Sequence, residues 1–66
     1  MRLFINGEAA ELPSGLTARQ LVEHLKLAGA RIALEVNGEI VPRSTYPERH
    51  LNDGDKVEII HAVGGG

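Results

Sequence analysis

The chain has 66 residues and a mass of 7.1 kDa, which allows one small domain. It contains no cysteine, so disulfides, zinc–thiolate sites and cysteine nucleophiles are excluded. A formal net charge of −2, with one Phe, one Tyr and no Trp, argues against a nucleic-acid-binding surface. No segment has the length and apolarity of a membrane span, and the first residues do not resemble a signal peptide. We therefore predict a soluble, cytoplasmic domain with an aliphatic core and no bound metal or cofactor.

Residues 1–12 predict a β-hairpin. Leu3 and Ile5 alternate with Phe4, which is the period of a strand with two distinct faces. Asn6-Gly7 is typical of a two-residue type I′ turn, because both residues tolerate a positive φ. Residues 8–12 then form a short return strand, which Pro13 ends.

Residues 18–27 predict a helix with clear start and stop signals. Thr17 is a favourable N-cap, and Gln20 three residues later completes a capping box. Gly29 is placed where a left-handed residue would end the helix. Helical spacing gives one apolar stripe facing a core, formed by Ala18, Leu21, Val22 and Leu25.

The remainder of the chain predicts a second hairpin, a loop and a last strand. Residues 32–41 alternate around Asn37-Gly38, which repeats the first turn signal. Residues 43–52 have no clean period and predict a connecting loop with one helical turn. After the turn Asp53-Gly54-Asp55, residues 56–63 form the final strand. The order β-β-α-β-β-β predicts an α+β domain over residues 1–63, one helix on a mixed sheet, with a flexible tail at 64–66.

Three consecutive glycines, Gly64, Gly65 and Gly66, end the sequence. At average glycine usage a terminal run of three arises roughly once in 3,000 chains. Glycine has no Cβ, so such a tail can extend into a narrow channel and present the Gly66 carboxylate as an acyl donor once that group is activated. The alternative interpretation is a frayed terminus or an engineered scar.

Over essentially its whole length the chain resembles the ubiquitin-like β-grasp sulfur carriers. The likeness lies in the hairpin–helix–hairpin order, the turn at 53–55, the strand at 57–63 and the terminal glycines. Residues 36–43, with Tyr46 shortly after them, are similar to the middle segment of the ThiS family, the sulfur carriers of thiazole formation in thiamine biosynthesis.

This resemblance implies a carrier protein, not an enzyme. An E1-like adenylyltransferase of the ThiF type would use ATP to adenylate the Gly66 carboxylate. A sulfur donor protein would then convert it to a thiocarboxylate, and a thiazole synthase of the ThiG type would take the sulfur. We expect a monomer when the chain is free. The alternatives are a molybdopterin-synthase small subunit, a protein-conjugating ubiquitin-like carrier or, from another class, a non-catalytic β-grasp binding module.

Strand alternation also predicts an apolar surface beside the tail. Phe4, Ile60 and Ala62 point away from the core. Because the first and last strands are neighbours in a β-grasp fold, we expect these three residues to form one patch that binds the activating and acceptor enzymes.

The three histidines do not have the spacing of a metal motif. His24 and His50 are interpreted as surface residues. His61 shares a strand face with Val57 and Ile59, so it either covers the edge of the core or helps to position the tail in a partner.

Overall fold

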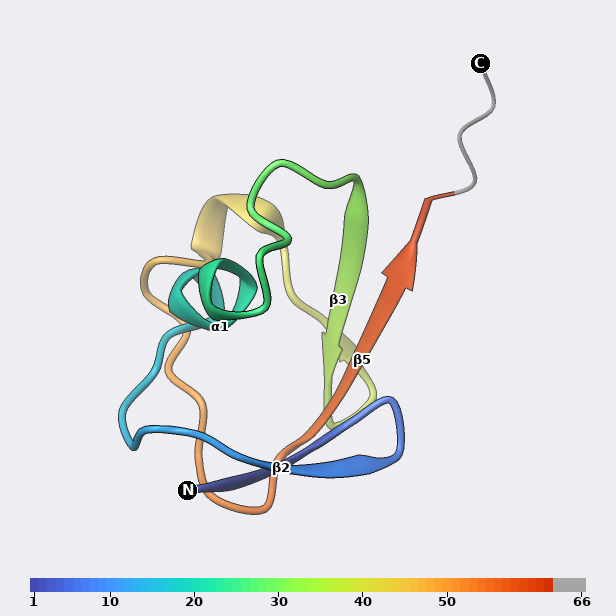
Figure 1. The fold of residues 1–66 in the computed structure, drawn as a ribbon. Helices are drawn as coiled ribbons and strands as arrows, with labels where there is room; N and C mark the ends of the chain where they lie inside the picture. Colours follow the sequence, from blue (N-terminus) through green and yellow to red (C-terminus); the bar gives the residue numbers. More distant parts are fainter. Residues whose placement is uncertain (63–66) are drawn as a thin grey trace.

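The computed structural model describes residues 1–62, which form one helix and a five-stranded sheet. The elements are β1 (Arg2–Ile5), β2 (Glu8–Glu11), α1 (Ala18–His24), β3 (Ile32–Val36), β4 (Glu39–Ile40), a 3₁₀ turn η1 (Arg43–Thr45) and β5 (Lys56–His61). The strand order is β2-β1-β5-β3-β4, with β1 parallel to β5 and the other pairs antiparallel. Helix α1 covers one face of the sheet (Figure 1). This confirms the predicted α+β arrangement and element order.

Both Asn-Gly turns adopt the predicted type I′ conformation. Asn6 and Gly7 have φ angles of 50° and 84°, and Asn37 and Gly38 have 52° and 85°. Positive φ at both central residues matches the right-handed twist of the flanking strands. The two hairpins therefore form from signals within a few residues of each turn.

The asparagine side chains of these turns also bind β5. Asn6 Oδ1 accepts a hydrogen bond from the Ile59 N–H at 2.7 Å, and its Nδ2 donates to the Ile59 carbonyl at 3.3 Å. Asn37 Oδ1 accepts from the Lys56 N–H at 3.0 Å, and its Nδ2 donates to Asp55 Oδ1 at 2.9 Å. Each turn thus fixes one stretch of the central strand.

Helix α1 begins as predicted but ends earlier. The Gln20 N–H donates to Thr17 Oγ1 at 3.2 Å and the Thr17 N–H donates to Gln20 Oε1 at 2.9 Å, which is the predicted capping box. The predicted end at residue 27 is wrong, because the helix stops at His24.

The residue that ends α1 in the left-handed region is Lys26, with a φ of 61°, and not Gly29. The Lys26 N–H donates to the Glu23 carbonyl at 3.0 Å, and the Leu27 N–H donates to the Val22 carbonyl at 2.8 Å. This is a Schellman motif. Leu27 packs against the core that contains Val22, so the apolar contact sets the end of the helix despite the strain at Lys26.

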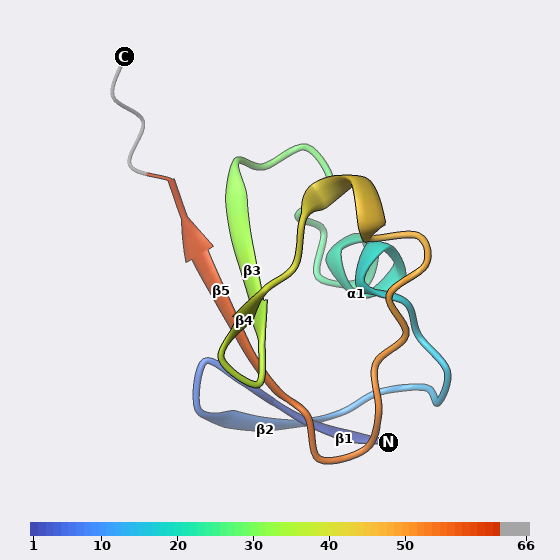
Figure 2. The same cartoon turned by 180° about the vertical axis from the view of Figure 1, so that it is seen from behind.

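The core lies between α1 and the inner face of the sheet. Leu3, Leu21 and Leu34 are fully buried at its centre. Leu25, predicted on the apolar stripe, is only partly buried, because it follows the last helical turn. Several core residues come from segments outside the main strands and helix: Leu12, Val41, Tyr46 and Leu51. The long connection after β4, with η1 in it, therefore closes the core (Figure 2).

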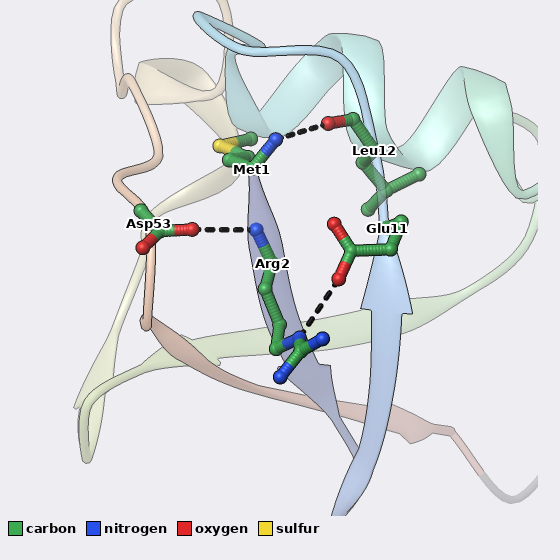
Figure 3. Close-up of polar contacts among 5 residues, drawn as sticks. All are labelled: Met1, Arg2, Glu11, Leu12 and Asp53. Atoms are coloured by element: carbon green, nitrogen blue, oxygen red, sulfur yellow. Dashed lines mark hydrogen bonds and ion pairs between the residues drawn. The ribbon is translucent and has the colours of Figure 1, made fainter.

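Polar contacts hold β1 to its neighbours at the end away from the first turn (Figure 3). The Met1 ammonium donates to the Leu12 carbonyl at 2.6 Å, and the Arg2 N–H donates to Asp53 Oδ1 at 2.6 Å. Arg2 Nε donates to Glu11 Oε1 at 2.8 Å, and this hydrogen bond together with the Glu11 charge raises the pKa of the guanidinium. The Arg2–Glu11 pair is exposed, so it contributes little to the free energy of unfolding.

Candidate functional site

The predicted reactive tail follows β5, the central strand of the sheet. Val57 and Ile59 anchor this strand in the core, with 1% and 7% of their surface exposed. The Ala62 N–H still donates to the Arg31 carbonyl at 2.9 Å, so β5 remains attached to the segment before β3 up to that residue. Gly64, Gly65 and Gly66 lie outside the described residues, as does Val63, and their role stays a prediction.

The face of the sheet opposite α1 carries the large exposed apolar side chains of residues 1–62. These are Phe4, Ile40 and Ile60, with 36%, 61% and 47% of their surface exposed. Phe4 and Ile60 each follow a buried residue on their strands, so alternation directs them away from the core. Ile40 is the cross-strand partner of Glu35, which lies between two buried residues on β3, so it takes the same face as Glu35. We call this surface the outer face. Ala62 is also exposed.

The three predicted patch residues share the outer face but do not form one contiguous patch. The register pairs Phe4 with Lys56, and Ile60 lies four residues later on β5. That separation is about 13 Å at the usual rise per residue. Ile60 instead pairs with Ala33 of β3, and Glu58 lies between Ile60 and Lys56. The role of Phe4, Ile60 and Ala62 in binding an enzyme stays a prediction.

Two features of the outer face were not predicted from the sequence. Ile40, the most exposed of the large apolar residues, lies beside Glu35 in the β3–β4 pairing. Glu35 in turn lies directly opposite Glu58 of β5. Alternation alone could have placed these residues outward, but only the pairing register brings the two carboxylates together.

The histidines are spread over the surface. His24, His50 and His61 are all exposed, and residues 1–62 contain no group of three acidic or histidine side chains placed to hold a metal ion. His61 is exposed and pairs with Ile32, which packs against the core, and its role at the edge of the core stays a prediction. Its alternative role beside the tail stays a prediction.

Within residues 1–62, no helix has the length and apolarity of a membrane span.

Comparison with known proteins identifies the family. The sequence model of the ThiS family matches residues 3–66, which is nearly the whole chain and includes the three terminal glycines. The chain belongs to the ThiS family. It is 32% identical to the sulfur carrier protein ThiS of Escherichia coli over all of both proteins. The match thus covers both the β-grasp domain and the tail.

A solved ThiS structure has the same fold. The crystal structure of the thiamine biosynthesis protein ThiS from Geobacter metallireducens aligns with a TM-score of 0.88 and 33% identity over the whole of both chains. The fold is therefore the ubiquitin-like β-grasp fold, as predicted. The chain is also 42% identical to part of a thiazole synthase from Paramagnetospirillum magneticum, but it spans only 20% of that protein's length.

Proposed function

We propose that this chain is a sulfur carrier for thiamine biosynthesis and that the carboxylate of Gly66 carries the sulfur. The observation that supports this most strongly is the family match, which extends from residue 3 to Gly66. The E. coli protein that is similar over its full length is a sulfur carrier. The chain itself is not an enzyme in this proposal, because other proteins activate and use the tail.

The proposed chemistry needs a free carboxylate on a narrow tail. A carboxylate is a poor electrophile, so an E1-like adenylyltransferase first joins the Gly66 carboxylate to AMP and releases pyrophosphate from ATP. A sulfur nucleophile then attacks the acyl carbon and displaces AMP, and a thiocarboxylate results. Glycines without Cβ atoms let the backbone extend into the active site of the partner.

The proposed acceptor is a thiazole synthase. Support comes from the Paramagnetospirillum protein named thiazole synthase, in which a segment similar to this whole chain belongs to the same polypeptide. A carrier segment joined to its acceptor keeps the sulfur at high effective concentration. In this proposal a sulfur donor protein supplies the sulfur, and thiazole synthase takes it from the Gly66 thiocarboxylate.

Intact mass spectrometry tests the proposal. The chain is incubated with ATP and a ThiF-type adenylyltransferase, and then with sodium sulfide. We expect first a Gly66 acyl-adenylate and then a species in which one oxygen is replaced by sulfur. This species should lose its sulfur when thiazole synthase and its other substrates are added.

Three tail variants serve as controls for the reaction. Deletion of Gly65 and Gly66, or addition of an Asp after Gly66, should abolish both products, because a small displacement of the reacting group is costly. Gly65→Val should be nearly as damaging, since its β-branched side chain restricts and widens the tail. None should change the melting temperature. If the chain with the added Asp is still adenylated at the normal rate, the carrier proposal is refuted and the binding-module alternative replaces it.

A further inference from the structure

Two glutamates lie side by side at the centre of the outer face. Glu35 of β3 and Glu58 of β5 are direct cross-strand partners, and both follow buried residues on their strands. Like charges directly opposite each other destabilise a sheet. The ion pairs within residues 1–62 are Arg2–Glu11 and Arg19–Glu23, so no described cation pairs with either glutamate.

Apolar side chains border this acidic pair on one side, and a lysine and a phenylalanine lie on the other. Ile40 lies beside Glu35 on β4, and the next register pair along β3 and β5 is Ala33 with Ile60. On the other side Lys56 lines the same shallow hollow as the two glutamates, and Phe4 lies beside it. The outer face therefore has an acidic centre with Ile40 and Ile60 beside it and with Lys56 and Phe4 on its other side.

We propose that the Glu35–Glu58 pair binds an arginine of the adenylyltransferase when that enzyme takes the tail. This inference rests on the proposed function. A guanidinium is planar, and its N–H donors point outward along more than one edge, so it can donate hydrogen bonds to two carboxylates at once. Arginine is also favoured at protein interfaces beside apolar side chains. A second copy of this chain fits poorly, because a symmetric contact would place one acidic pair against another.

A bound arginine would give a function to two like charges that lie opposite each other on β3 and β5. Repulsion between Glu35 and Glu58 costs stability in the free chain, and a bound guanidinium removes that repulsion. Replacing either carboxylate should therefore stabilise the free protein and weaken the complex. A purely structural surface pair would show no such opposed effects.

The experiment compares Glu35→Gln, Glu58→Gln and Glu58→Lys with the wild-type chain. Thermal melts report the free protein, and the carrier concentration dependence of adenylation gives kcat and KM. Removing the repulsion should raise the melting temperature by about 1–7 °C. Loss of one charged hydrogen-bonded contact should raise KM about tenfold or more, with kcat unchanged once the carrier is saturating. Glu58→Lys should have the largest effect on KM, because it places a cation opposite the arginine.

Glu39→Gln is the matched control. It removes one carboxylate from the adjacent strand β4, where the cross-strand partner is Val36 and not an acid. We expect its melting temperature and KM to stay close to the wild-type values. Added salt should raise the wild-type KM more steeply than that of Glu58→Gln, because salt screens the charged contact.

The outcomes separate this inference from the proposed function. If the wild-type chain is not adenylated, the proposed function fails and this inference fails with it. If wild-type adenylation is normal but the Glu35 and Glu58 variants keep the wild-type KM, only the inference is overturned. It is also overturned if Glu39→Gln raises KM as much as they do, or if the variants instead change self-association in sedimentation.

Discussion

Truncation of Leu21 is the sharpest test of the core. Leu21 lies on the inner side of α1 and has 0% of its surface exposed, so Leu21→Ala deletes apolar atoms that neighbouring side chains cannot easily replace. Substitutions of this kind cost about 3–5 kcal/mol. A 66-residue domain is expected to have a free energy of unfolding of about 3–10 kcal/mol. The variant should therefore either be largely unfolded at room temperature or have a melting temperature far below that of the wild-type chain.

The assay is a thermal melt followed by circular dichroism, with Leu25→Ala as the matched control. A domain of this size has an unfolding entropy of about 0.14 kcal/mol per kelvin, so Leu21→Ala should lower the melting temperature by at least about 20 °C. Leu25 is partly buried at the C-cap, so the same truncation should cost about 1 kcal/mol, or about 7 °C. Equal melting temperatures for the two variants would refute the assignment of the inner face of α1.

Three further substitutions test the helix end, the second turn and the outer face. Lys26→Gly should raise the melting temperature by about 4–7 °C, because glycine relieves the left-handed strain, whereas Lys26→Ala keeps the Cβ and should give no gain. Asn37→Asp replaces the donor to Asp55 with an acceptor and should cost about 1–3 kcal/mol in a urea titration. Phe4→Asp and Ile60→Asp should weaken adenylyltransferase binding in calorimetry while the melt changes little, because both residues are exposed before binding.

Each of these has a contradicting result. A melting temperature for Lys26→Gly at or below that of Lys26→Ala would show that the left-handed conformation is not strained. An unchanged urea midpoint for Asn37→Asp would remove the bond to Asp55 from the forces that hold the second turn. A large loss of folded stability in Phe4→Asp or Ile60→Asp would mean that the strand register is displaced by one residue, since a one-residue slip exchanges the two faces.

Features that depend on short stretches of chain could be predicted from the sequence. Both hairpins follow from Asn-Gly turns, and the start of α1 follows from Thr17 and Gln20. In each case the groups that interact lie within four residues of one another, so the local pattern contains all the information. The family likeness, including the terminal glycines, is also a property of the sequence, and the family match confirms it.

The tertiary structure alone decided where distant segments meet. The end of α1 at His24 depends on Leu27 packing against the core, which overrides the preference for glycine. The pairing of Glu35 with Glu58, and of Phe4 with Lys56, depends on how β3 and β1 align with β5. Alternation predicts which face each residue takes but not its neighbour on the next strand. That neighbour follows from the register that buries the most apolar surface across the whole sheet, which no local stretch of sequence specifies.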